Sequence, residues 1–330
     1  MRFSNRMYRR VPNAALLLTG AVTAAVPARQ LQAQGLTPAT FANLHFRNIG
    51  PAAMSGRVVD LAVVEAHPYT FYVATSTGGV WKTTNNGVTI TPVFEKESTH
   101  SVGAIAVHQV DTNIVWVGTG ERANRQSNSW GDGVYKSTDG GRTWRNMGLR
   151  DSHHVGRVAL HPTDPNIVFV AAMGHLWGPN DERGLYLSRD GGGSWTRVLH
   201  VDSVTGVVDV AIDPYDPSTV YAASYQRMRQ PFGFHGGGPG SALWKSTDGG
   251  RTWRKLTAGL PASDKGRIGI SIYRRDPRIV YLSVEQGYRY NASTAYTRSA
   301  AGVYRSEDRG ETWTHMSTWN PRPMYASQIL

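Results

Sequence analysis

Cysteine is absent from this 330-residue chain, and lysine is scarce, with six among the 35 basic residues. Without cysteine the chain has no disulfide bonds and no thiolate metal ligands, so packing alone must stabilise it. Beyond residue 30, no stretch of useful length shows the spacing of an amphipathic helix. The motifs HExxH and GxSxG and the glycine loops that bind nucleotides are also absent. The signatures of zincins, α/β-hydrolases and nucleotide-binding enzymes are therefore missing.

The N-terminus has the pattern of an export signal. Four arginines precede the apolar run at 14–26, and small residues follow it at Ala28 and Ala33. This order is typical of a secretory signal peptide, and the apolar run is too short to span a membrane. We therefore expect a signal peptide at 1–33, a linker at 34–45, a secreted or periplasmic location and no membrane span.

Much of the net charge lies in that leader. Residues 1–33 hold five arginines and no acidic residue, so the formal net charge of +11 falls to +6 for the remainder. The other basic residues are scattered, whereas a nucleic-acid-binding surface needs a clustered basic stripe with aromatic residues in it. The sequence predicts no nucleic-acid partner and no cofactor.

A short motif recurs through the rest of the chain. Its copies read STDGGRTW at 137–144 and 246–253, SRDGGGSW at 188–195, SEDRGETW at 306–313 and, in decayed form, TTNNGVTI at 83–90. Counted from Asn85, the aspartate position recurs at intervals of 54, 51, 58 and 60 residues, which indicates a repeated supersecondary unit. Ser and Asp can bond the backbone of a tight turn, and glycine permits positive φ. One carboxylate per copy is too few for Ca²⁺, so the motif predicts a structural turn.

Each repeat contains four short strand-like segments, and the motif forms the turn between the third and the fourth. Four antiparallel strands in a repeat of this length are typical of a β-propeller blade. We therefore predict an all-β fold, a β-propeller with about five four-stranded blades at 46–330. Residues 324–330 resemble the start of a sixth blade. We expect the chain to be truncated within a repeat, with further C-terminal blades in the same protein.

The repeats differ in the loop between their second and third strands. This loop is short in the first repeat and longer at 121–133, 174–184, 226–241 and 285–302. Function gathers on loops held by a rigid scaffold, so we predict that these inserts form a ligand site. Their candidate ligand-binding residues are Glu121, Arg122, Arg125, Trp130, His175, Trp177, Glu182, Arg183, Arg227, Arg229 and His235.

The segments that lead into the first strands share that end of the propeller. Their candidate ligand-binding residues are Arg57, Asp60, His153, His154, Arg157, Asp209 and Arg267. Alignment of the repeats puts Asp60, Arg157 and Asp209 at one equivalent position, at the mouth of the central channel. A structural alternative is that these three side chains pair with one another, because buried charges need partners.

Two kinds of chemistry can be drawn from these residues. Two carboxylates across a cleft could hydrolyse glycosides. The available pairs are Asp60 with Asp209 and Glu121 with Glu182. The adjacent His153 and His154 could suggest a metal, but neighbouring residues on a strand point to opposite faces. We therefore predict no metal site.

The repeated motif makes the chain resemble the Asp-box, or BNR, propellers, which include sialidases, xyloglucan-active endoglucanases and the luminal propeller of sortilin. It is most similar to large exported bacterial proteins labelled sortilin-like or "glycosyl hydrolase". The shared patterns are FRNIGP at 46–51, GRV at 56–58, WGDGVYK at 130–136, LWGPN at 176–180, GGGPG at 236–240 and NPRPMY at 320–325. The resemblance covers 46–330.

The active sites of the enzymes in that superfamily do not carry over. The endoglucanases have a catalytic aspartate two residues before a Gly-Gly pair in the first blade, and this chain has Ser76 there, in ATSTGG at 74–79. Serine cannot act as that acid. Sialidases need three convergent arginines, and Arg47 only loosely resembles the first of them.

The sequence thus predicts an exported propeller that binds a peptide, a protein or a glycan on its insert loops, with no catalysis in this chain. The alternative is a glycoside hydrolase, endoglucanase-like or sialidase-like, that uses carboxylates of the inserts. Converging carboxylates in an open cleft would favour the enzyme. Acids that are already paired, beside a mouth lined by arginine and aromatic residues, would favour binding.

Overall fold

The computed structural model describes residues 37–42, 44, 57–124, 128–287, 300–320 and 329. The chain divides into two compact units, Met1–Ile49 and Gly50–Leu330. In the first unit the described residues include one 3₁₀ helix, η1 (Pro38–Phe41). The predicted signal peptide lies outside the described residues. Among the described residues, no helix has the length and apolar character needed to cross a membrane.

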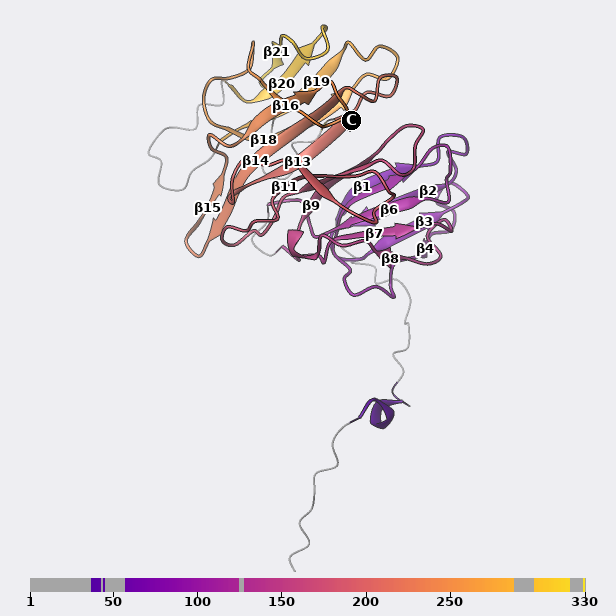
Figure 1. The fold of residues 1–330 in the computed structure, drawn as a ribbon. Helices are drawn as coiled ribbons and strands as arrows, with labels where there is room; N and C mark the ends of the chain where they lie inside the picture. The colour runs from indigo at the N-terminus through magenta and orange to yellow at the C-terminus, as the bar shows by residue number, and fades with distance from the viewer. Residues whose placement is uncertain are drawn as a thin grey trace, which may run out of the picture. The chain divides into compact units, whose positions relative to one another are not determined.

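The described part of the second unit consists of five antiparallel sheets, which confirms the predicted all-β propeller fold (Figure 1). Each sheet takes its strands from one stretch of chain, in sequence order. The strands, sheet by sheet, are β1 (Val58–Val63), β2 (Phe71–Thr75), β3 (Val80–Thr83) and β4 (Thr91–Pro92); β5 (Val102–Val107), β6 (Val115–Thr119), β7 (Val134–Ser137) and β8 (Arg145–Asn146); β9 (Val155–Leu160), β10 (Val168–Ala172), β11 (Gly184–Ser188) and β12 (Thr196–Leu199); β13 (Thr205–Ile212), β14 (Val220–Gln230), β15 (Gly233–Gly236), β16 (Ala242–Ser246) and β17 (Arg254–Leu256); and β18 (Lys265–Ile272), β19 (Val280–Gln286), β20 (Gly302–Ser306) and β21 (Thr314–Ser317). A second 3₁₀ helix, η2 (Arg150–Ser152), precedes β9.

Apolar clusters between neighbouring sheets form the core. The first strands β1, β5, β9, β13 and β18 lie next to one another in succession, and each pair of successive sheets encloses a cluster. Between the second and third sheets, for example, Trp116 of β6 is fully buried and meets Trp195 edge to face, with 6.0 Å between the ring centroids. A blade therefore buries its faces against its neighbours, as in other propellers and repeat proteins.

The fifth sheet is complete without a strand from the beginning of the chain. Strands β18 to β21 supply all four of its described strands, and β1 belongs to the first sheet. Among the described residues, then, no N-terminal strand joins the last blade. The segment predicted to begin a sixth blade, 324–330, lies outside the described residues except for Ile329.

The Asp-box motifs are turns held by their own side chains. In the second blade Asp139 accepts the backbone N–H of Thr143 at 2.9 Å and its hydroxyl at 2.6 Å, while Ser137 donates to Asp139 at 2.8 Å. The indole of Trp144 donates to the carbonyl of Val93, in the preceding blade, at 2.7 Å. The equivalent aspartates Asp190, Asp248 and Asp308 make the same two bonds four residues ahead. The motif therefore builds turns, as predicted.

We expect the fold to lose stability in acid as these carboxylates become protonated. Hydrogen bonds from Thr143 lower the pKa of Asp139 from 3.8 to about 2, and those from Ser194 lower the pKa of Asp190 to about 2. Because the folded-state pKa is depressed, the stabilisation is complete above about 3.8 and is lost as the pH falls through about 2. Urea unfolding across that range should show the decline. Asp139→Asn should make the free energy of unfolding fall less steeply in acid. An unchanged pH dependence would show that Asp139 does not cause the fall.

Candidate functional site

The insert loops and the segments that lead into the first strands lie at one end of the sheets, opposite the Asp-box turns. The antiparallel order requires this arrangement. Two contacts illustrate it: Arg57 forms an ion pair with Glu121, and the N–H of Gly131 donates to the carbonyl of His153 at 2.7 Å. We call this end the insert face; it comprises the described parts of the four inserts and the residues just before the first strands. The predicted ligand residue Arg125 lies outside the described residues.

Several arginines that were predicted to contact a ligand are buried instead. They are Arg122, Arg183, Arg227 and Arg267. Arg183 donates to three carbonyls around and within its own insert, at 2.5 to 3.2 Å. Arg122 donates to the carbonyls of Val59 and Gly156, in the first and third blades. Burial lowers the pKa of Arg122 to about 9, which still leaves it charged at neutral pH. These guanidinium groups bind backbone carbonyls. Because they are buried, the structure gives no support for direct contact with a ligand.

Asn124 connects two inserts and was not singled out from the sequence. Its side chain is fully buried. Its Oδ1 accepts a bond from Arg227 at 2.8 Å, and its Nδ2 donates to the hydroxyl of Tyr225 at 2.6 Å. Its carbonyl accepts from Arg229 at 3.4 Å. An asparagine within a polar loop gives no sequence signal of such a role.

The equivalent charged positions on the first strands pair with one another, as the structural alternative predicted. Nε of Arg157 lies 2.9 Å from Oδ1 of Asp209, and its Nη1 lies 3.6 Å from Oδ1 of Asp60. Each aspartate also accepts a backbone N–H from a neighbouring blade, Asp60 from Ile105 at 3.2 Å and Asp209 from Ile270 at 2.9 Å. The negative charge of Asp209, and to a lesser extent that of Asp60, raises the pKa of Arg157 above its ordinary value. Both carboxylates are thus occupied by structural bonds.

Three glutamates of the insert face are buried or half-buried. Glu121 is buried beside Arg57, and burial raises its pKa. Glu182 is half-buried, and burial raises its pKa as well. Glu285, which the sequence did not single out, is buried and accepts the N–H of Arg267 at 3.0 Å. Burial raises the pKa of Glu285 to about 7.

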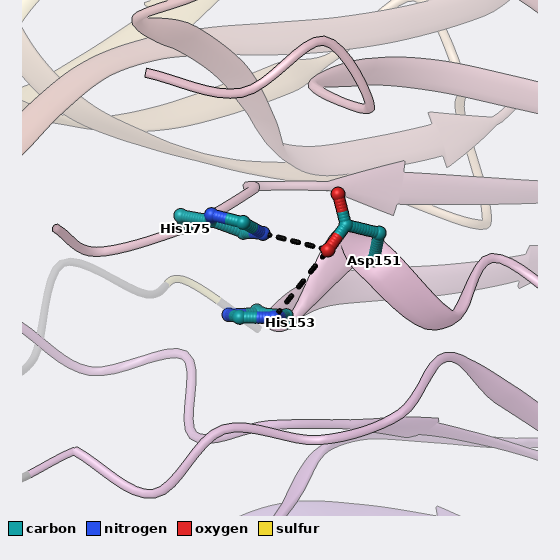
Figure 2. Close-up of side chains that lie close together, drawn as sticks. All are labelled: Asp151, His153 and His175. Carbon is teal, nitrogen blue, oxygen red and sulfur yellow. Dashed lines mark hydrogen bonds and ion pairs between the residues drawn. The ribbon is translucent and has the colours of Figure 1, made fainter. Parts of the chain in front are cut away.

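The rings of Trp130, His153 and His175 stack on the insert face, and Figure 2 shows the two histidines. The side chain of Trp130 is 66% exposed and stacks on His153, with 5.7 Å between the ring centroids. His153 in turn stacks on His175 at 3.7 Å. Asp151, on η2, points its Oδ1 toward both histidines. The cluster brings together three predicted residues and one, Asp151, that was not predicted.

His153 and His154 lie just before β9 rather than on a strand, and their side chains meet different partners. His154 is buried, and its Nδ1 lies 2.9 Å from the carbonyl of Glu121, so Nδ1 carries the proton. Burial lowers the pKa of His154 well below its ordinary value. His153 has φ 53° and ψ −40°, a rare conformation for a non-glycine residue. The expectation of no metal site considered only this pair, whereas His153 lies near Asp151 of η2 and His175 of the third blade's insert.

The hairpin of β14 and β15 carries the remaining predicted residues. The guanidinium of Arg229 lies over the ring of Phe234, 4.7 Å from its centroid. Trp177 forms a parallel bridge with Arg229 through its backbone, and its side chain is 50% exposed. His235 is half-buried in β15, opposite Met228.

A cavity of about 590 Å³ opens at the other end of the first strands, beside the turns that follow them. Its lining includes Leu61, Val107, His161, Tyr215 and Arg274, with Arg157 as well. It was not predicted from the sequence, because its walls are the ends of the first strands and their turns, which hardly vary between repeats.

Parts of this chain are similar in sequence to a known protein family and to known enzymes. The family model for sortilin (neurotensin receptor 3) matches residues 183–327. A xyloglucanase, Xgh74A of Acetivibrio thermocellus, is 31% identical over 180 residues, which cover 50% of this chain and 18% of that protein. A xyloglucanase of Hypocrea jecorina is 26% identical over 245 residues, which cover 66% of this chain and 28% of that protein.

Solved structures are similar as well. An ancestral GH74 enzyme superposes with a TM-score of 0.58 at 21% identity, over 82% of this chain and 32% of that one. The GH74 enzyme of Niastella koreensis gives a TM-score of 0.54 at 23% identity, over 78% of this chain and 38% of that one. This chain thus spans less than a third of these curated relatives and at most about two fifths of these solved chains.

The similarities confirm the predicted resemblance to sortilin-like and glycosyl-hydrolase-like Asp-box propellers. The relatives are named xyloglucanases, which agrees with the expectation that any enzyme activity is glycoside hydrolysis. They favour the glycoside hydrolase alternative over the interpretation without catalysis.

Proposed function

We propose that this chain is the polysaccharide-binding part of an exported glycoside hydrolase, and that a β-glucan such as xyloglucan lies along its insert face. The supporting observation is the exposed indole of Trp130, which stacks on the ring of His153, itself stacked on His175. The names of the relatives supply the substrate class. The sequence predicts a peptide, a protein or a glycan as ligand. Because the relatives are named for a glycan substrate, we propose the glycan.

The insert face suits a sugar chain for a physical reason. The apolar face of a pyranose ring packs well against a flat aromatic ring, and the hydroxyls at its edge can bond polar neighbours. Trp130 offers such a ring, and stacking on His153 fixes its plane. Trp177, two residues after His175, offers a second exposed indole.

The carboxylates support a binding role for this chain more than the cleavage step. Asp60 and Asp209 are bonded to Arg157, and Glu121 is bonded to Arg57. Ser76, at the position of the endoglucanase aspartate, is buried, and its Oγ accepts the N–H of Arg57 at 3.3 Å. We therefore assign sugar binding to this chain and cleavage to the whole protein.

Replacing Trp130 by alanine should weaken xyloglucan binding about three- to tenfold, the loss expected when one stacking contact of ~0.5–1.5 kcal/mol is removed. The melting temperature should stay unchanged, because the side chain is largely exposed. Affinity electrophoresis in xyloglucan gels and calorimetry with xyloglucan oligosaccharides measure the effect. Tyr69→Ala is the matched control, since Tyr69 is 65% exposed and lies at the opposite end of the blades.

Two outcomes would count against the proposal. Equal affinities for the Trp130→Ala and Tyr69→Ala variants would remove the insert face as the sugar-binding surface. Release of oligosaccharides from xyloglucan by this chain alone would show that it catalyses the reaction itself, which contradicts the division of roles.

A further inference from the structure

Three side chains on the insert face bring metal-ligating atoms close together (Figure 2). The Nε2 atoms of His153 and His175 lie 3.6 and 3.0 Å from Oδ1 of Asp151. All three donor atoms lie within 4.8 Å of one another. We propose that Asp151, His153 and His175 bind a divalent transition-metal ion such as Zn²⁺. This site shares His153 and His175 with the proposed sugar-binding surface, but the Zn²⁺ measurements that test it do not require that surface to bind a sugar.

The spacing of the donors suits a small ion better than a hydrogen-bonded network. Donors placed tetrahedrally about 2.1 Å from Zn²⁺ stand ~3.4 Å apart, close to both of the separations from Asp151. A purely hydrogen-bonded arrangement would need each histidine to donate to Asp151. The bond from His175 is satisfactory at 3.0 Å, but the 3.6 Å separation of His153 is too long for a hydrogen bond.

The donor set also decides the class of ion. Imidazole nitrogen suits Zn²⁺ and its neighbours in the first transition row, whereas Ca²⁺ and Mg²⁺ prefer oxygen ligands throughout. Two imidazoles and one carboxylate supply three protein ligands. A tetrahedral ion then keeps its fourth position open for water or for an oxygen of a bound molecule.

The surroundings of the triad support a positive charge at this point. Glu182 lies close enough to Asp151 and His175 for both to act on the charge of its carboxyl group. Its Oε2 is buried and has no hydrogen-bond partner among the described residues. A carboxylate in that state is stabilised by a nearby cation, either as a further ligand or through a metal-bound water.

The backbone of His153 gives an independent indication. Its positive φ of 53° costs energy in a residue that has a side chain, and such strain gathers at ligand sites. The conformation lets the chain turn between η2 and β9 while the imidazole reaches His175. If the histidine pair only filled space, a relaxed backbone with another side chain would serve as well.

Zn²⁺ binding to the tag-free protein tests the proposal by calorimetry and equilibrium dialysis, with Ca²⁺ as the comparison ion. We expect one tightly bound Zn²⁺ per chain and no comparable Ca²⁺ binding. His175→Gln and Asp151→Asn should each weaken Zn²⁺ binding at least tenfold, in the range seen when metal-site residues are altered. His235→Gln is the matched control, because His235 is half-buried on the same face but lies outside the triad.

A spectroscopic readout separates coordination from an indirect effect on folding. Co²⁺ in place of Zn²⁺ should give visible d–d absorption bands that change in His175→Gln and stay the same in His235→Gln. Circular dichroism of each variant shows whether it is folded. The proposal is overturned if the folded His175→Gln and Asp151→Asn variants bind Zn²⁺ as tightly as the parent protein, or if the parent protein binds none.

Discussion

Replacing Arg157 by leucine should lower the free energy of unfolding by about 3–5 kcal/mol, because it leaves the buried carboxylate of Asp209 without its ion pair and leaves Asp60 with only Arg122, 3.7 Å away. In the native protein Nε of Arg157 lies 2.9 Å from Asp209, and its Nη1 lies 3.6 Å from Asp60. Three blades contribute to this bridge, so its loss also loosens the contacts between their first strands. Urea unfolding at neutral pH, followed by tryptophan fluorescence, measures the change.

A combined variant separates the buried charges from the lost packing. In Asp60→Asn/Arg157→Leu/Asp209→Asn no buried carboxylate remains at this level, so part of the lost stability should return, although Arg122 loses the carboxylate that lies 3.7 Å from it. Recovery should be incomplete, because Asp60 accepts N–H groups with both of its oxygens and asparagine has only one. Arg157→Leu alone should also regain stability as the pH falls and the unpaired carboxylate of Asp209 becomes protonated. A loss below about 1 kcal/mol in Arg157→Leu would mean that solvent already screens this bridge.

The frame of the propeller could be predicted from the sequence because it repeats. The spacing of the Asp-box motifs defines the blades, and alignment of the repeats puts Asp60, Arg157 and Asp209 at one equivalent position. Their pairing follows from elementary electrostatics, since buried charges of opposite sign at one level need each other. The geometry confirms that alternative.

The contacts of the inserts could not be predicted in this way. An arginine that binds a ligand and one that braces a loop are the same residue type, and only the path of the backbone decides between them. Arg183 turns inward to three carbonyls, while Trp130 stays outside. Asp151 was not predicted as a site residue, because it lies in η2, outside the inserts whose length varies between repeats. The stacking of His153 on His175 depends on the positive φ of His153, which the sequence does not predict.

Arg227 gives the sharpest test of whether the inserts brace one another or hold a ligand. Its Nη1 donates to Oδ1 of Asn124 at 2.8 Å, and its Nη2 donates to the carbonyl of Gly174 at 3.3 Å. These bonds join the inserts of the second, third and fourth blades inside a fully buried site. Burial lowers the pKa of Arg227 to about 9, so it is still charged at neutral pH.

Arg227→Met should therefore lower the free energy of unfolding by about 2–4 kcal/mol, since two buried acceptors lose a charged donor. Arg229→Met is the control on the same strand: Arg229 is only half-buried, and loss of its contact with Phe234 should cost about 1 kcal/mol or less. Xyloglucan affinity, measured at a temperature where each variant is folded, should change little in Arg227→Met. If Arg227→Met kept full stability and lost sugar binding, the guanidinium would have to reach the ligand, and the bracing role assigned to the buried arginines would be wrong.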